Sequence, residues 1–195
     1  MNLIQPPHLK RGDKIAIVAS ERKISMQELQ SAIDIFKSWG LEVVLSKNIF
    51  NQDHQFSGTD AERAADLQIA LDDDSIKAII SARGGYGTMR IIDKLDFTKF
   101  KQHPKWVIGY SDITVLHSHI HNFGIQTLHA TMPINFSVNK EAVETMRKVL
   151  FGEKFNYEIQ KHPLNRVGTA EAEVVGGNLS LLYALTGSAS SIHMI

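Results

Sequence analysis

The chain has 195 residues and equal numbers of basic and acidic side chains, 21 of each, so its formal net charge is zero. This balance gives no support to nucleic-acid binding, which needs a basic excess or a basic face. The absence of cysteine excludes disulfides, thiolate catalysis and cysteine-ligated zinc. The N-terminus lacks the apolar core of a signal peptide, and no segment is long enough to span a bilayer, so we expect a cytoplasmic protein without a membrane or nucleic-acid partner.

The first predicted elements are a strand and an amphipathic helix. Residues 14–19 form a short apolar run that predicts a strand. Ser25 and Glu28 have the spacing of a capping box, and apolar residues then recur at helical intervals until Gly40. This pattern predicts a helix with one face in the core.

The same alternation continues along the chain. Residues 42–45 predict a second strand, Thr59 and Glu62 repeat the capping-box spacing ahead of a second helix, and residues 76–81 predict a third strand. A glycine-rich loop at 82–87 follows that strand. Strands that alternate with helices predict a parallel sheet covered on both faces.

Five further elements are predicted before residue 150. They are a short helix near 88–94, a strand at 105–109, a helix at 112–122, a possible strand at 126–128 and a helix at 141–150. The fold class is therefore α/β, with a parallel sheet flanked by helices in the manner of flavodoxin. Such sheets place their functional sites at the carboxyl ends of the strands.

The pattern changes after residue 150. Residues 155–160 and 171–175 have the composition of strands, and Asn178 is predicted to cap a helix that follows two glycines. One strand and one helix cannot enclose a core, so we predict that a second domain begins here and is incomplete. The predicted division is an N-terminal α/β domain at 1–150, a linker at 151–168 and the start of a C-terminal domain at 169–195.

Ser111 is the residue from which a reaction class can be argued. It follows an apolar strand at a turn that Gly109 permits, and a helix begins directly after it. This is the setting of a nucleophile elbow, where backbone N–H groups stabilise a developing oxyanion. The alternative is a serine that only caps the helix, with Asp112 in the first turn. Ile113 stands where the G-x-S-x-G motif has its second glycine. The residue pattern alone favours the cap, because a lone motif is weak evidence.

The loop Arg83-Gly-Gly-Tyr-Gly87 is a candidate for anion binding, because glycines allow close approach of backbone N–H groups. Its alternative is an ordinary turn between a strand and a helix. The loop matches neither G-x-G-x-x-G nor a P-loop, and we predict no cofactor. Because the loop and the serine turn both follow strands, they lie on one edge of the sheet. Together they predict an oxyanion hole with one N–H group from Gly85 or Tyr86 and one from Asp112.

Three histidines at 117, 119 and 121 invite a metal-site interpretation. On a helix only His117 and His121 share a face, and no nearby carboxylate completes a ligand set. We therefore predict no metal site here, and a helix surface with some partly buried imidazoles.

Four segments, taken together and in order, resemble the LD-carboxypeptidase family. This family of serine peptidases includes muramoyltetrapeptide carboxypeptidases and microcin C immunity proteins. The similarity runs from the strand that begins near residue 12 to about Gly187. The four segments are Arg83-Gly-Gly-Tyr-Gly87, Gly109-Tyr-Ser-Asp-Ile-Thr114, Leu128-His-Ala-Thr-Met-Pro133 and Gly176-Gly-Asn-Leu-Ser-Leu-Leu182.

The resemblance implies an activity and a set of roles. Family members hydrolyse the bond between an L-configured centre and a terminal D-residue, typically releasing D-alanine from cytoplasmic murein tetrapeptides during cell-wall recycling. Ser111 is the implied nucleophile, and the amides of Asp112 and Gly85 are the implied oxyanion hole. The implied fold is a parallel-sheet domain followed by a smaller C-terminal domain, usually in a homodimer.

The chain also departs from the family pattern. Its first loop, Ala19-Ser-Glu-Arg22, lacks the usual richness in proline and serine, and His129-Ala-Thr-Met replaces His-Gly-Pro-Met. The glutamate and histidine of the family's triad lie beyond the Gly-Gly-Asn-Leu segment, and nothing after Gly187 matches them. We therefore expect a truncated member that is inactive alone, since a serine nucleophile needs a base. A microcin C-type immunity peptidase and a non-catalytic, truncated peptide-binding module are the alternatives.

Overall fold

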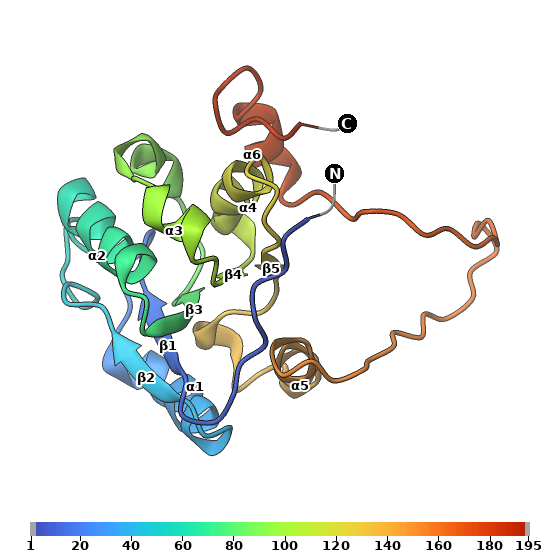
Figure 1. Cartoon of the computed structure of the whole chain (residues 1–195), viewed down its shortest axis with the longest axis horizontal. Helices are drawn as coiled ribbons and strands as arrows, with labels where there is room; N and C mark the ends of the chain where they lie inside the picture. The colour runs from blue at the N-terminus through green and yellow to red at the C-terminus, as the bar shows by residue number, and fades with distance from the viewer. Residues whose placement is uncertain (1–2, 194–195) are drawn as a thin grey trace.

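The computed structural model describes residues 3–193 of the chain. Five parallel strands form one sheet in the order β2-β1-β3-β4-β5, which is the strand order of flavodoxin-like folds. The predicted parallel α/β sheet is thus confirmed (Figure 1). The strands are β1 (Lys14–Val18), β2 (Glu42–Leu45), β3 (Ile76–Ser81), β4 (Trp106–Gly109) and β5 (Leu128–His129).

Helices cover both faces of the sheet (Figure 1). One face packs against α1, α5 and the short helix η4, and the other face packs against α2, α3 and α4, with α6 lying on α4. The α-helices are α1 (Met26–Ser38), α2 (Asp60–Asp72), α3 (Thr98–Gln102), α4 (Thr114–His121), α5 (Lys140–Leu150) and α6 (Leu179–Ala184). The 3₁₀ helices are η1 (Thr88–Arg90), η2 (Ile92–Lys94), η3 (Ser111–Ile113) and η4 (Pro133–Asn135).

The central strands are largely apolar because both of their faces are buried, and the polar exceptions in β1 and β3 are Lys14, Lys77 and Ser81. In β1, Ile15 and Ile17 join the core beneath α1, whereas Ala16 and Val18 join the core beneath α2. Parallel strands with covered faces show this continuous hydrophobic run instead of a polar alternation. The two cores hold the carboxyl ends of β1, β3 and β4 side by side.

Both predicted capping boxes are confirmed, and they fix where α1 and α2 begin. Ser25 Oγ accepts a hydrogen bond from the Glu28 N–H group at 3.3 Å, and Glu28 Oε2 accepts one from the Ser25 N–H group at 2.8 Å. Thr59 and Glu62 form the same pair of hydrogen bonds at the start of α2. Each box satisfies backbone donors that the first helical turn leaves unpaired.

Two of the predicted helices consist wholly or partly of 3₁₀ turns. The segment near 88–94 forms η1 and η2 instead of one helix, with N–H groups that bond three residues back, from Arg90 to Gly87 and from Lys94 to Ile91. The helix expected from 112 opens with η3, and α4 begins only at Thr114. The five-residue α3 was not predicted, since it is too short to show a helical stripe.

The strands predicted at 155–160 and 171–175 are wrong. Both segments are extended but join no ladder among residues 3–193, and the side chains of Ile159 and Val174 are 87% and 95% exposed. A strand needs a neighbour to pair its backbone groups, and this stretch runs away from the sheet as a long excursion between α5 and α6 (Figure 1). The chain returns at Asn178, whose N–H group donates to Thr114 Oγ1 at 2.9 Å and whose side chain caps α6 as predicted.

None of the helices that the structure describes is long and apolar enough to cross a membrane.

Candidate active site

Ser111 lies on a strained turn between β4 and α4. Its backbone φ is +60°, in the left-handed region that side-chain-bearing residues seldom adopt. Gly109 allows the turn, because a β-carbon there would come within 2.7 Å of Ile113 Cγ1. The N-cap of η3 is Tyr110 and makes no side-chain cap, so the reading of Ser111 as a helix cap is wrong. A serine on a strained strand-to-helix turn is the geometry of a nucleophile elbow.

The glycine-rich loop meets this turn. A β-carbon on Gly84 would lie 3.4 Å from Ser111 Oγ and 3.2 Å from Ser111 Cβ. Gly85 lies instead against Arg22, where a β-carbon would come within 2.7 Å of Arg22 Cγ. The two motifs that the sequence places on one sheet edge are therefore in direct contact, and Gly84 is the point of contact.

The polar groups at this contact have no hydrogen-bond partner in the part of the chain that the structure describes. Across residues 3–193, no acceptor is bonded to the N–H groups of Gly84, Gly85 or Asp112, and Ser111 Oγ makes no hydrogen bond. In such an arrangement the hydroxyl can attack a carbonyl, and the unpaired N–H groups can donate hydrogen bonds to the oxyanion that forms.

The Asp112 carboxylate ties the loop to the serine turn. Its side chain is buried, and Oδ2 accepts a hydrogen bond from the Thr88 N–H group at 2.8 Å. Burial raises the pKa of Asp112, whereas hydrogen bonds from the N–H groups of Thr88 and Gly87 oppose that rise. The residue after Ser111 thus anchors the end of the glycine loop through its side chain while its own N–H group stays available.

A second carboxyl group, which no sequence motif indicated, lies behind the turn. Glu21 is fully buried, with Oε2 at 2.8 Å from Ser81 Oγ and Oε1 at 3.3 Å from Thr88 Oγ1. Burial, together with the nearby Asp112 carboxylate, raises the pKa of Glu21 to about 8. The available signal was an acidic residue two positions after an apolar strand, on the edge where the functional loops converge.

His117 of α4 is hydrogen-bonded to the backbone of the serine turn. Its imidazole is buried, with Nε2 at 2.9 Å from the Gly109 carbonyl and Nδ1 at 2.8 Å from Thr127 Oγ1. A carbonyl only accepts, so Nε2 carries the proton and Nδ1 accepts from the threonine hydroxyl. Burial lowers the pKa of His117 to about 4. The imidazole is therefore neutral, and both of its nitrogens are engaged.

The other two helix histidines lie elsewhere. His119 Nδ1 is 2.8 Å from Ser190 Oγ, and His121 Nδ1 is 3.5 Å from a Glu173 carboxylate oxygen. The expectation of a helix surface is wrong for His117, which is buried, and fits His119 and His121, which are partly buried. Within residues 3–193 no cluster of three or more His, Asp or Glu side chains could hold a metal ion.

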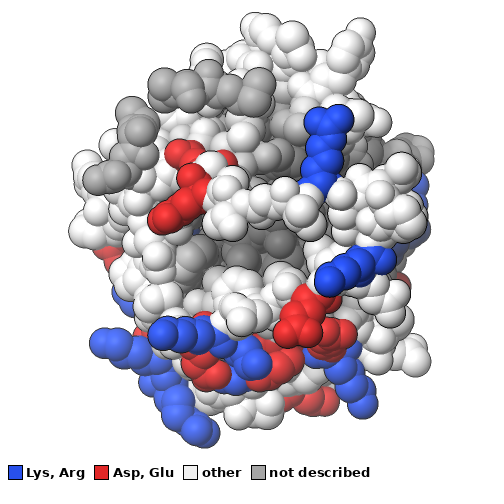
Figure 2. Space-filling view, turned by 90° about the vertical axis from the view of Figure 1, so that its right-hand side faces the viewer, with Lys and Arg blue, Asp and Glu red and all other residues white. Residues whose placement is uncertain are grey.

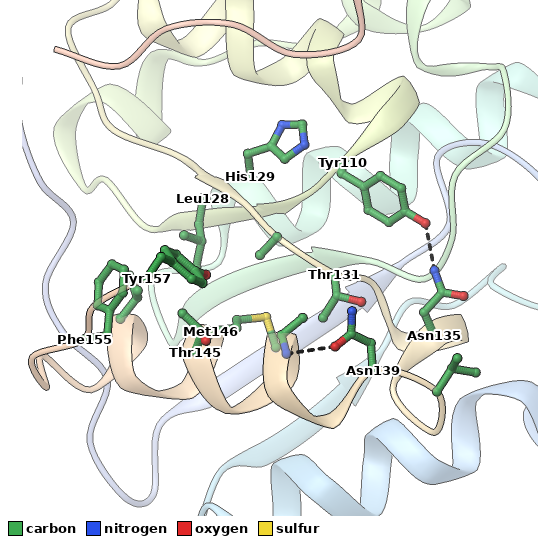
Figure 3. Close-up of a pocket in the computed structure, with 14 residues that line it drawn as sticks. Tyr110, Leu128, His129, Thr131, Asn135, Asn139, Thr145, Met146, Phe155 and Tyr157 are labelled. Atoms are coloured by element: carbon green, nitrogen blue, oxygen red, sulfur yellow. Dashed lines mark hydrogen bonds between the residues drawn. The ribbon is translucent and has the colours of Figure 1, made fainter. Parts of the chain in front are cut away.

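A cavity of about 620 Å³ opens beside the serine turn, between β5 and α5. Figure 3 shows the Tyr110 ring at its edge, with the hydroxyl accepting a hydrogen bond from Asn135 Nδ2 at 2.7 Å. The 14 residues that line the cavity include no Lys, Arg, Asp or Glu. Most charged side chains on this side of the molecule gather along its lower edge (Figure 2). The cavity can therefore receive an uncharged, partly polar ligand segment, and its volume is typical of small-molecule sites.

Comparisons with known proteins agree with this fold. A probable murein peptide carboxypeptidase of Bacillus subtilis (strain 168) is 38% identical over 192 residues, which cover 94% of this chain and 60% of that protein. The microcin C7 self immunity protein MccF has a TM-score of 0.80 at 21% identity, over 95% of this chain and 66% of the solved one. A muramoyltetrapeptide carboxypeptidase of Oxalobacter formigenes has a TM-score of 0.73 at 24% identity, over 93% and 62%.

The two structural matches support the fold, and the chain spans about 60% of the length of its curated relative. The sequence match to a family covers more than half of the chain. Residues 15–130, which include the glycine loop and the serine turn, match the family described as LD-carboxypeptidase N-terminal domain. The chain therefore belongs to the LD-carboxypeptidase family.

Proposed function

We propose that this chain carries the nucleophile of a serine LD-carboxypeptidase that removes the terminal D-residue, typically D-alanine, from murein tetrapeptides. The observation that supports this proposal best is Ser111 itself. It has a left-handed backbone, it lies against Gly84 of the glycine loop, and its hydroxyl makes no hydrogen bond to residues 3–193. The curated relative in Bacillus subtilis is named a probable murein peptide carboxypeptidase, which supports a murein peptide as the substrate.

In the proposed reaction, Ser111 Oγ attacks the carbonyl carbon of the scissile peptide bond and gives its proton to a general base. The carbonyl oxygen becomes an oxyanion, which accepts hydrogen bonds from the N–H groups of Asp112 and Gly85. The tetrahedral intermediate collapses, the base passes the proton to the amine of the D-residue, and that amine leaves. Water then hydrolyses the acyl-serine ester by the same route.

The base is the part of this mechanism that residues 3–193 do not offer to Ser111. No His, Asp or Glu side chain among them is hydrogen-bonded to Ser111 Oγ, and His117 already uses both nitrogens. We propose that the base belongs to a second domain that begins at 169–195, after an N-terminal domain at 1–150 and a linker at 151–168. The working protein is then a cytoplasmic homodimer, and this 195-residue chain alone has orders of magnitude less activity.

The test is D-alanine release from a murein tetrapeptide by the protein in its full natural length. We expect Ser111→Ala to reduce kcat at least 1000-fold, on the order seen when a serine nucleophile is removed. Ser137→Ala removes an exposed serine outside the site and should leave kcat unchanged. Turnover that survives Ser111→Ala would rule out Ser111 as the nucleophile.

Two other functions give different outcomes in the same assay. MccF has been solved in complex with aspartyl sulfamoyl adenosine, so hydrolysis of this compound and not of the tetrapeptide would indicate an immunity-type peptidase. Tight binding of the tetrapeptide without turnover would indicate a non-catalytic peptide-binding module.

A further inference from the structure

The buried Glu21 carboxyl group lies where three neighbouring strands end. It follows β1, it contacts Ser81 at the end of β3, and through Thr88 it reaches Asp112, which follows β4. The proposed reaction gives the Glu21 carboxyl group no part. A buried carboxyl group beside a candidate active site needs an explanation, because an ionised carboxylate is strongly disfavoured away from water.

The hydroxyl of Ser81 indicates the protonation state of this carboxyl group. Ser81 Oγ lies 2.8 Å from Glu21 Oε2 and 3.1 Å from the main-chain oxygen of Arg83. A hydroxyl has one proton, and the Arg83 oxygen can only accept. Both contacts are satisfied when Ser81 donates to Arg83 and Glu21, as a carboxylic acid, donates to Ser81 Oγ.

The charges that face Glu21 favour the same state. Asp112 approaches from η3. Arg63 of α2 lies beside Gly87, close to the Glu21 backbone, and its charge acts on Asp112. Arg63 is already engaged with the Ser20 carbonyl and with Asp60. The Asp112 carboxylate is held by the N–H groups of Thr88 and Gly87. Asp112 Oδ1 is buried without a partner among residues 3–193, but Oδ2 has a backbone N–H donor, whereas the contacts of Glu21 there are hydroxyl groups. The negative charge is therefore better stabilised on Asp112, and the proton belongs on Glu21.

We propose that Glu21 is a positioning residue which, as a neutral carboxylic acid, holds Thr88 and Asp112 in place and thereby fixes the turn that carries Ser111. The role in catalysis rests on the proposed function of Ser111, whereas the coupling of Glu21 to the turn does not. Ionised Glu21 cannot donate to Ser81, and it repels the Asp112 carboxylate that anchors the glycine loop.

The first experiment follows the turn directly, by recording the amide resonances of Thr88 and Asp112 from pH 5 to pH 9. In the wild-type protein both should shift together with a midpoint near 8, the pKa of Glu21. Glu21→Gln is neutral at every pH and should abolish the shift. Glu42→Gln, which removes an exposed carboxylate on β2, should leave it unchanged. In Asp112→Asn the midpoint should move to lower pH, because the repelling charge is gone.

A flat wild-type titration, or a titration that survives Glu21→Gln, would overturn the proposal. So would a titration abolished by Asp112→Asn, since the proton would then belong to Asp112. The wild-type and Asp112→Asn results decide the question even if Glu21→Gln fails to fold.

The second experiment measures kcat for D-alanine release against pH, with the protein in its full natural length. The wild-type kcat should fall about tenfold by one unit above the pKa of Glu21, with KM unchanged, and Glu21→Gln should remove this fall. A fall that persists in Glu21→Gln would overturn the positioning role and leave the proposed function intact. If no D-alanine is released at any pH while the amides titrate as expected, the proposed function fails and the coupling of Glu21 to the turn stands.

Discussion

Ser111 holds a backbone conformation that residues other than glycine, asparagine and aspartate seldom adopt. At φ +60°, the β-carbon crowds the following carbonyl, at a cost of about 1–2 kcal/mol. The surrounding structure maintains this conformation through His117 on one side, which bonds the Gly109 carbonyl, and Asp112 on the other. Strain held at one partly buried polar residue points to a function for that residue.

This strain predicts an unusual order of stabilities for two variants that both remove the hydroxyl. Glycine relieves the left-handed conformation and alanine does not, so we expect Ser111→Gly to be more stable than Ser111→Ala by about 1 kcal/mol. Urea unfolding at pH 7 measures the difference. Ser31 in the middle of α1 is the matched control, because there alanine should exceed glycine by about 1 kcal/mol. The same order at both positions would show that the Ser111 turn is not strained.

At the scale of elements, side-chain caps decide where the principal helices begin. Ser25, Thr59 and Asn178 each accept a hydrogen bond from the N–H group three residues later. At α1 and α2 the glutamate at that position returns a second hydrogen bond. These contacts are local in sequence, so the residue order alone determines them.

We expect Thr59→Ala to lower the free energy of unfolding by about 1 kcal/mol, because it removes the acceptor for the Glu62 N–H group at the start of α2. Thermal or urea unfolding measures this change. Thr169→Ala alters an exposed threonine outside any helix or strand and should change the free energy of unfolding by less than about 0.5 kcal/mol. Equal effects of the two substitutions would contradict the role of the cap.

The elements that the sequence predicts correctly are those whose signal is local. Capping boxes and apolar runs predict α1, α2 and the central strands. The alternation of strands and helices predicts that the glycine loop and the serine turn lie on one edge of the sheet, where Gly84 lies against Ser111. The strands expected at 155–160 and 171–175 fail because pairing needs a neighbour, which a composition pattern does not specify. Glu21 was missed for a related reason, since its burial depends on groups that β3 and β4 bring to it.

At the scale of the whole molecule, two buried groups make stability depend on pH in opposite directions. His117 has a folded-state pKa of about 4, below its ordinary 6.5, so its contribution is present above pH 6.5 and is lost as the pH falls towards 4. Glu21 has a folded-state pKa of about 8, above its ordinary 4.5, so its contribution is present below pH 4.5 and is lost as the pH rises towards 8. The two windows overlap between pH 4.5 and 6.5, where the effects cancel.

We therefore expect the free energy of unfolding to be nearly flat between pH 4.5 and 6.5 and then to fall by about 2 kcal/mol towards pH 8, at roughly 1.4 kcal/mol per unit. Urea unfolding at pH 5, 6.5 and 8 tests this. Glu21→Gln should remove the fall above 6.5 and expose a loss below it, whereas His117→Gln should show a continuous decline from 4.5 to 8. Glu42→Gln should follow the wild type. Parallel curves for the wild type and Glu21→Gln above pH 6.5 would mean that Glu21 is already ionised in the folded protein, and the neutral carboxyl group behind Ser111 would have to be abandoned.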